Sequence, residues 1–190
     1  AFASSLDQGG IFANSALDAA IALENISGFD NKDSTSLNKK VPSFFNEASS
    51  TNKDHIVGIP RSIIKNIKDS EVKSNFYDSV KILEKSGIKT KEIDLENIEF
   101  SLPVYYVIAP AECSANLSRY DGVRFGHRCE NPKNLEDLYA RSRAEGFGEE
   151  VKKRILIGTY CLSAGYYDDY YIKAQKVRNL IKESFVNAFK

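Results

Sequence analysis

The clearest alternation of apolar and polar positions lies between residues 55 and 95. Ile56-Val57-Gly58-Ile59 is a short apolar run that Pro60 stops, which predicts a buried strand. Residues 88–95 alternate between apolar and polar side chains and predict a second strand. Between them, apolar residues recur every three or four positions on one face of a helix that Gly87 closes: Val72, Phe76, Val80 and Leu83. Strand, helix and strand in this order predict a βαβ unit with parallel strands and a right-handed crossover.

The residues before this unit give weaker indications. Residues 1–5 predict an opening strand, and residues 7–10 predict a turn. Ser15 with Asp18 three residues later is the acidic variant of a capping box, so we expect a helix that begins there and ends before Gly28 as its C′ residue. Residues 30–54 are rich in Asn, Ser, Lys and Asp and are expected to form a surface loop.

After Pro103 the pattern becomes helical. We expect helices over 104–119, 135–145 and 149–162, the second of them capped by Asn134. A last helix, from Tyr167 onward, carries one apolar face made of Tyr170, Ala174, Val177, Ile181 and Phe185. The predicted fold class is therefore α/β, with strands in the first half and helices dominating the second.

Composition and charge exclude some classes of protein. Lys+Arg and Asp+Glu both number 26, so the formal net charge is zero, which argues against a protein whose main role is to coat nucleic acid. No apolar run approaches the roughly 18 to 20 residues that span a bilayer. Cys113, Cys129 and Cys161 are odd in number and far apart, which favours reduced thiols in a cytoplasmic or organellar-matrix protein.

Two polar clusters suggest catalysis but lack the necessary partners. Ser4-Ser5 lies beside Asp7, yet no glycines of a nucleophile elbow flank the pair, so a strand end with its turn is the better interpretation. His127, Cys129 and Glu130 could ligate a metal, but a structural zinc site needs four ligands, typically in two spaced pairs. The chain has 2 histidines and no C-x-x-C spacing, so we expect a loop without a metal or a Cys–His catalytic pair.

Aromatic and basic residues near the end of the chain suggest a nucleic-acid platform. The run 165–171 contains four tyrosines and precedes Lys173, Lys176 and Arg178, an arrangement that can stack bases. Helical spacing favours packing instead, with one tyrosine of each pair buried and the charges in solvent.

Two further residues could meet a small polar ligand. Arg154 follows Lys152 and Lys153, and it either reaches solvent or grips a carboxylate through two hydrogen bonds. Tyr105 and Tyr106 are expected in the first turn of a helix, where a phenol can meet a polar ligand, although core packing is the simpler explanation.

A series of short motifs bears on whether these residues bind a ligand or only pack in the core. The motifs are Phe2–Gln8, Gly28–Ser36, Pro103–Ala109, Asn116–Gly126, Ser142–Gly148, Glu150–Ile155 and Gly165–Tyr171. In this order, and over essentially the whole chain, they resemble the A subunits of glutamyl-tRNA(Gln)/aspartyl-tRNA(Asn) amidotransferases, a branch of the amidase signature family. Arg119-Tyr-Asp-Gly-Val-Arg124 and Ser142-Arg-Ala-Glu-Gly-Phe-Gly148 distinguish that branch from other amidases. One departure is visible, because Gly9-Gly-Ile-Phe12 stands where the family usually has a glycine–proline pair.

The resemblance implies a portion of the amidase-signature fold, a mixed β-sheet covered by helices. Residues 1–190 are then expected to be an interior part of a single amidase-type domain, with the N-terminal catalytic part and a C-terminal part outside them. The implied reaction is hydrolysis of glutamine to glutamate and ammonia by a Ser–cis-Ser–Lys triad. All three triad members match positions before Ala1, so the resemblance places no catalytic residue in this chain and we expect the segment alone to be inactive.

The resemblance also implies partners and a ligand site. The family's B subunit receives the ammonia, uses ATP and magnesium, and holds most of the misacylated Glu-tRNA(Gln) or Asp-tRNA(Asn), while a small C subunit braces the complex. No cofactor and no membrane contact are implied for this segment. Tyr105 matches the tyrosine that lines the glutamine pocket, and Arg154 matches the arginine that binds the substrate α-carboxylate. An acidic partner for the α-amino group would lie beyond Lys190.

Two alternatives stay open at this point. The chain could come from another amidase-signature hydrolase that acts on a different small amide. It could also be a non-catalytic helical module that docks a partner.

Overall fold

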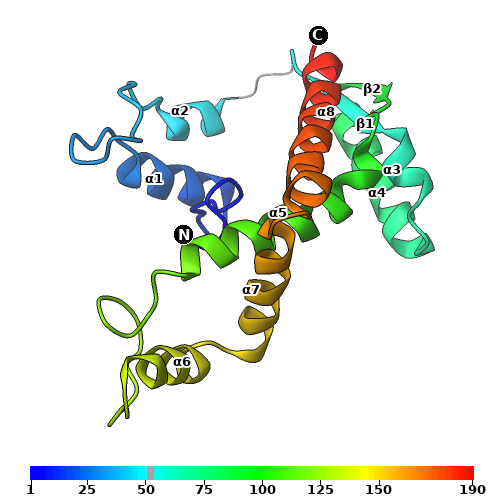
Figure 1. The fold of residues 1–190 in the computed structure, drawn as a ribbon. Helices are drawn as coiled ribbons and strands as arrows, with labels where there is room; N and C mark the ends of the chain where they lie inside the picture. The colour runs from blue at the N-terminus through cyan, green and yellow to red at the C-terminus, as the bar shows by residue number, and fades with distance from the viewer. Residues whose placement is uncertain (51–53) are drawn as a thin grey trace. The chain divides into compact units, whose positions relative to one another are not determined.

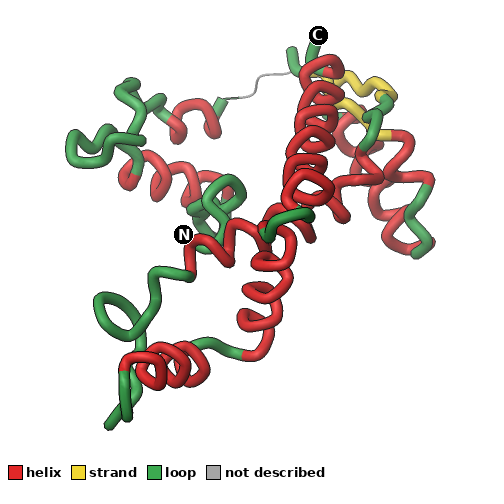
Figure 2. The backbone as a smooth tube through the Cα atoms, in the orientation of Figure 1, coloured by secondary structure: helices red, strands yellow, loops and turns green. Residues whose placement is uncertain are grey.

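Helices make up most of the structure, a computed structural model that describes residues 1–50 and 54–190 (Figures 1 and 2). The α-helices are α1 (Ala16–Ile26), α2 (Phe44–Ser49), α3 (Arg61–Lys65), α4 (Ser70–Lys85), α5 (Ser101–Leu117), α6 (Leu135–Gly146), α7 (Glu149–Leu162) and α8 (Lys173–Ala188). The remaining elements are the strands β1 (Ile56–Pro60) and β2 (Lys89–Ile93), a 3₁₀ turn η1 (Ile98–Phe100) and a π-helix η2 (Tyr167–Ile172). The chain divides into one unit of residues 1–7, 58–74 and 92–190 and a second unit of residues 8–57 and 75–91.

The predicted βαβ unit is confirmed. β1 and β2 pair in parallel and form the sheet of the described residues, which Figure 2 shows in yellow. Gly87, with φ of 92°, follows the end of α4, as expected for a glycine in the left-handed region. Gly58 lets the strands pack closely, because a Cβ there would lie 2.8 Å from Cδ1 of Ile93. The short helix α3, directly after Pro60, was not predicted.

In the second unit, α1 follows the sequence prediction and α2 does not. The Ser15 side chain accepts a hydrogen bond from the Asp18 amide at 3.1 Å, so this N-cap is confirmed. Residues 44–49 are helical within the predicted surface loop 30–54, of which 51–53 lie outside the described residues. The Glu24 carboxylate of α1 accepts from the Phe45 amide at 3.2 Å, so a neighbouring helix satisfies the start of α2.

The predicted opening strand is wrong. The Asp7 carboxylate accepts hydrogen bonds from the Phe2 amide at 2.6 Å and from the Ala3 amide at 3.0 Å. The amides of Leu6 and Asp7 in turn donate to the Ala3 carbonyl at 2.9 and 2.8 Å. These contacts close a turn over residues 3–6, earlier than the turn expected at 7–10.

In the first unit, α5 packs against α7 and α8, which Figure 1 shows in green and in orange to red. The core cluster consists of Val104, Ile108 and Ala174, with Val107 and Val177 packed against it. α6 begins at the predicted N-cap Asn134, whose side chain accepts from the Asp137 amide at 2.8 Å. α7 has the predicted bounds.

The last predicted helix is divided into η2 and α8. Ala174 is buried and Val177 and Ile181 are half-buried, but Tyr170 and Phe185 remain 41% and 39% exposed, so only the middle of the predicted face is covered. Within the part of the chain that the structure describes, every helix is too short or too polar to cross a bilayer.

Candidate functional site

The structure brings Tyr105 and Arg154 into contact. Tyr105 lies on α5, in the second turn rather than the expected first turn because the helix begins at Ser101, and Arg154 lies on α7. The Nη1 of Arg154 donates a hydrogen bond to the Tyr105 hydroxyl at 3.2 Å. Two residues that are 49 positions apart in sequence therefore form one polar group on the surface of the first unit.

Glu150, one turn before Arg154 on α7, completes this group. Its carboxylate accepts from the Arg154 Nε at 3.0 Å, an i,i+4 ion pair. The Arg154 side chain is 26% exposed and Tyr105 is 40% exposed, so a ligand can reach both. With Nε used by Glu150, the end of the guanidinium that carries Nη1 and Nη2 is the edge that can meet a carboxylate in two parallel hydrogen bonds.

The crossing of α5 and α7 fixes the distance between the two residues. A Cβ on Gly158 would lie 1.9 Å from the Pro110 carbonyl oxygen, so the two backbones meet where only glycine fits. The hydroxyls of Ser114 and Thr159 are hydrogen-bonded across the same crossing at 2.8 Å. Arg154 lies one turn before Gly158, which places its side chain beside Tyr105.

The electrostatics of the group follow from these contacts. The hydrogen bond with Tyr105, followed by that with Glu150, raises the pKa of Arg154, so the guanidinium stays protonated. Burial raises the pKa of the Cys113 thiol on α5, and the charge of Arg154 opposes that rise. The site thus presents a fixed cation, a phenol and one carboxylate, which suits a small ligand that carries its own carboxylate.

Ser4 and Ser5 are not arranged as nucleophiles. The Ser5 hydroxyl contacts the Glu112 carboxylate of α5 and accepts from the Arg178 Nη1 of α8 at 2.6 Å. The Ser4 hydroxyl accepts from the Asn116 amide nitrogen at 2.8 Å. These bonds hold residues 1–7 against α5 and α8. The Asp7 carboxylate accepts hydrogen bonds from main-chain amides of the turn and not from the serine hydroxyls.

His127 and Cys129 point to different partners. The His127 Nε2 lies 2.8 Å from the Glu145 carboxylate of α6, whereas Cys129 is buried with its Sγ 3.7 Å from the Leu138 carbonyl. Among residues 1–50 and 54–190, no three His, Cys, Asp or Glu side chains are grouped so that they could hold a metal ion.

The tyrosine run packs mainly on itself. The rings of Tyr160, Tyr166 and Tyr170 lie with centroids 4.4 to 6.0 Å apart, and hydrogen bonding to Tyr166 raises the pKa of Tyr160 to about 12. The expectation that one tyrosine of each pair is buried is wrong, because Tyr166 and Tyr167 are both 41% exposed. The physical reason is that Tyr166 lies before the helix begins, while Tyr167 is in a π-helix, whose wider turn departs from the predicted helical spacing.

The fold and the site together define an α/β protein with an arginine–tyrosine pair suited to a carboxylate-bearing ligand. The chain belongs to the amidase family, whose model, described as Amidase, matches residues 1–190. The resemblance carried by the sequence motifs and the predicted fold class are thereby confirmed.

The relatives fall in the expected branch of this family. The chain is 54% identical over 189 residues to the glutamyl-tRNA(Gln) amidotransferase A subunit of Ruthia magnifica, covering 100% of this chain and 39% of that protein. It is 55% identical over 188 residues to the protein of the same name in Hahella chejuensis, covering 99% and 39%. The crystal structure of the glutamyl-tRNA(Gln) amidotransferase A subunit from Thermotoga maritima superposes with a TM-score of 0.69 at 37% identity, covering 99% of this chain and 36% of that one. The chain thus spans about 39% of the length of the curated relatives it matches.

Glu150 is the contributor that sequence reasoning missed. Its four-residue spacing from Arg154 was visible in the sequence and is the spacing of a helical ion pair. The Glu112 and Arg178 contacts to Ser5 had no such indication, because they join residues 107 and 173 positions apart.

Proposed function

We propose that these 190 residues supply part of the glutamine-binding site of a glutaminase subunit in tRNA-dependent amidation. The single observation that carries this proposal is the hydrogen bond of 3.2 Å between Arg154 and Tyr105, held by the ion pair to Glu150. The names of the relatives reported above supply the reaction, since they are A subunits of glutamyl-tRNA(Gln) amidotransferase.

In this proposal, the free edge of the Arg154 guanidinium binds the α-carboxylate of glutamine. Two parallel hydrogen bonds fix the plane of the carboxylate, which a lysine could not do. The Tyr105 hydroxyl accepts from Arg154, so its own proton can be donated to the same carboxylate or to water beside it. Glu150 keeps the side chain of Arg154 extended toward Tyr105 and so reduces the entropy lost when glutamine binds.

The chemistry itself belongs to residues that match the catalytic part of the family rather than to this segment. A serine nucleophile with a lysine as proton carrier would hydrolyse the amide, and the ammonia would pass to a B subunit. That subunit would use ATP and magnesium to amidate the misacylated tRNA, with a small C subunit bracing a heterotrimer. The unpaired cysteines support a reducing compartment, so we place the complex in the cytoplasm or an organellar matrix.

The test is steady-state kinetics of glutamine hydrolysis by the full-length protein in its complex. Arg154→Ala should raise KM for glutamine about thirtyfold or more, since truncating a charged hydrogen-bonded contact costs about 2 to 5 kcal/mol. Arg154→Lys should recover only part of this loss, because a lysine has no fork of donors. Tyr105→Phe should raise KM by less, about tenfold at most, for the loss of one hydrogen bond.

Lys153→Ala is the matched control, because Lys153 is the neighbouring exposed cation on α7 and, within the described residues, forms no ion pair or hydrogen bond with Tyr105 or Glu150. It should keep the KM of the unaltered protein. A normal KM for glutamine in Arg154→Ala would refute the assignment of the pocket.

A further inference from the structure

The connection between α5 and α6 presents a basic and aromatic surface that the glutamine site does not use. We call residues 119–128 the arginine turn. Its exposed cationic and aromatic side chains are Arg119, Tyr120, Arg124, Phe125 and Arg128. The formal charge of the chain is zero overall, yet residues 119–128 contain three Arg and one Asp. The local excess of positive charge is therefore a feature of this turn.

Hydrogen bonds fix the backbone of the arginine turn. The Asp121 carboxylate accepts from the amides of Val123 at 2.8 Å and Arg124 at 3.2 Å, and the bond from Val123 is the main cause that lowers the pKa of Asp121. The Gly122 amide donates to the Phe125 carbonyl at 3.1 Å. The Asp121 charge is thus directed at the main chain of the turn, and the exposed side chains are presented from a preorganised backbone.

α6 anchors the base of the turn. The Arg143 Nη1 donates to the carbonyls of Leu117 at 2.9 Å and Tyr120 at 3.0 Å. The Tyr120 ring meets the Phe147 ring edge-on, with centroids 6.4 Å apart. A ring held on one side in this way keeps its other surface available at little entropic cost.

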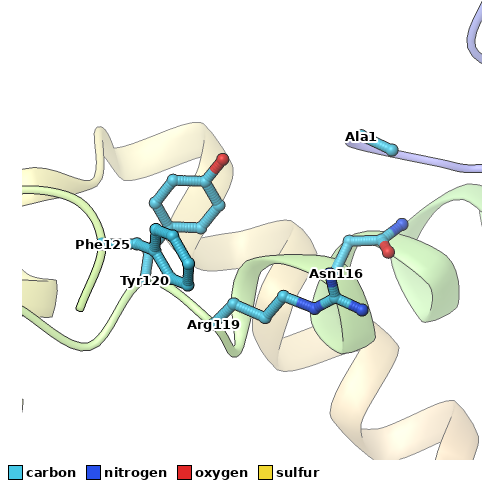
Figure 3. A pocket seen from close by; sticks show the side chains of 5 residues that line it. All are labelled: Ala1, Asn116, Arg119, Tyr120 and Phe125. Atoms are coloured by element: carbon cyan, nitrogen blue, oxygen red, sulfur yellow. The ribbon is translucent and has the colours of Figure 1, made fainter. Parts of the chain in front are cut away.

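A pocket of about 160 Å³ opens beside the turn (Figure 3). Asn116, Arg119, Tyr120 and Phe125 line it together with Ala1. Figure 3 shows the rings of Tyr120 and Phe125 on one side and the Arg119 guanidinium on the other, beside Asn116. The pocket therefore joins an aromatic wall to a cation.

Two of the cations have no acidic partner. Within the described residues, neither Arg119 nor Arg128 forms an ion pair or a side-chain hydrogen bond, whereas Arg141 and Arg154 each have a carboxylate. Among the residues that the structure describes, no carboxylate is bonded to the guanidinium of Arg119 or Arg128, so an external anion meets the full charge of each.

We propose that the arginine turn binds unpaired nucleotides of an RNA, with phosphates at Arg119 and Arg128 and bases against Tyr120 and Phe125. Stacking accepts any base, and arginine binds phosphate through its planar fork, so the two kinds of side chain together match a nucleotide. The proposal rests on the proposed function for the presence of an RNA, the tRNA substrate. A protein partner would use the rings equally well but would need to bring carboxylates to the arginines, so unpaired RNA is the occupant that the charges favour.

The experiment measures binding of a fluorescently labelled single-stranded oligoadenylate to the full-length protein by anisotropy over a range of salt concentrations. Arg119→Ala and Arg128→Ala should each weaken binding and reduce the salt slope by about 1, as expected when one phosphate is no longer bound. Phe125→Leu, which keeps an apolar side chain, should weaken binding about tenfold with little change in the salt slope. Lys182→Ala, which removes an exposed cation from α8, should leave both quantities unchanged.

Three results would overturn the proposal: no binding by the unaltered protein, variants that bind with the unaltered salt slope, or variants that lose a partner subunit in gel filtration while keeping their RNA affinity. The last result would assign the turn to a protein interface. The KM for glutamine of the Arg154 variants and the RNA affinity of the turn variants are measured in separate assays. A failure of the first refutes the proposed function, whereas a failure of RNA binding alone refutes only the assignment of the arginine turn.

Discussion

The α5–α7 crossing lies around Pro110 and Ser114 of α5, the arginine turn follows the C-terminal end of that helix, and the two regions are held in different ways. At the crossing, two backbones touch at Gly158 and Pro110, and one side-chain hydrogen bond joins Ser114 to Thr159. In the turn, carboxylate, guanidinium and hydroxyl groups bind main-chain amides and carbonyls. Packing thus fixes the Tyr105–Arg154 pair, while polar bonds to the backbone fix the turn, and the two regions should respond differently to substitution.

The largest effect is expected at the crossing. Gly158→Ala places a Cβ 1.9 Å from the Pro110 carbonyl oxygen, and a backbone atom cannot move away as a flexible side chain can. We expect a loss of about 3 kcal/mol or more in the free energy of unfolding. Chemical denaturation of the full-length protein measures it.

Gly148→Ser provides the control at the start of the same helix. A Cβ on Gly148 meets nothing within 4 Å, and serine is a favoured N-cap residue. Its effect should lie within about 0.5 kcal/mol. Equal destabilisation by both substitutions would show that the close approach of α5 and α7 is not what holds this region.

An intermediate effect is expected in the turn. Gly122 has φ of 79°, and a Cβ there would lie 2.5 Å from the Ser142 hydroxyl oxygen. Gly122→Ala should cost about 2 to 3 kcal/mol, from the left-handed backbone and from the displaced Ser142, which accepts from the Cys129 amide. Gly165→Ala has a similar φ of 88° but open space, so it should cost only about 1 to 2 kcal/mol. If the two variants have the same midpoint of unfolding, Ser142 does not support the turn.

The smallest effect depends on pH and concerns the outer side of the turn. The hydrogen bond from His127, followed by the charge of Arg141, lowers the pKa of Glu145 below its usual value of 4.5. A lowered carboxyl pKa stabilises the fold above pH 4.5, and this contribution disappears as the pH falls through the folded-state pKa. The Tm of Glu145→Gln should therefore lie below that of the unaltered protein at neutral pH and converge with it in acid.

Glu183→Gln on the exposed side of α8 serves as the control for this prediction. Its Tm should equal the Tm of the unaltered protein at each pH in the same range. A constant difference in Tm between Glu145→Gln and the unaltered protein at every pH would contradict a contribution from the ionised carboxylate.

Local sequence patterns predicted the elements whose stabilising contacts are themselves local. The N-caps Ser15 and Asn134 bond to amides three residues away, and the strand–helix–strand pattern around α4 needs only its own periodicity. The prediction of an opening strand was wrong because the Asp7 carboxylate accepts hydrogen bonds from the amides of Phe2 and Ala3. The pattern of apolar residues does not indicate these bonds. α2 was missed because its capping group, Glu24, comes from another helix.

The candidate site was predictable only through the resemblance to a family. Tyr105 and Arg154 lie in unremarkable helical patterns, and their contact depends on a crossing whose signature is a single glycine, Gly158. Distances between helices follow from packing, which a one-dimensional pattern does not contain. The partner Glu150, by contrast, could be deduced from the four-residue spacing.

The three buried cysteines give each of the two regions its own chemical reporter. Cys113 on α5 and Cys161 on α7 flank the crossing, and Cys129 lies beneath the arginine turn. Burial raises the pKa of the Cys113 and Cys161 thiols, so little thiolate forms while the fold is closed. The rate at which each thiol is alkylated, followed by peptide mass spectrometry, therefore measures the rate of local opening at the crossing and at the turn separately, without any engineered label.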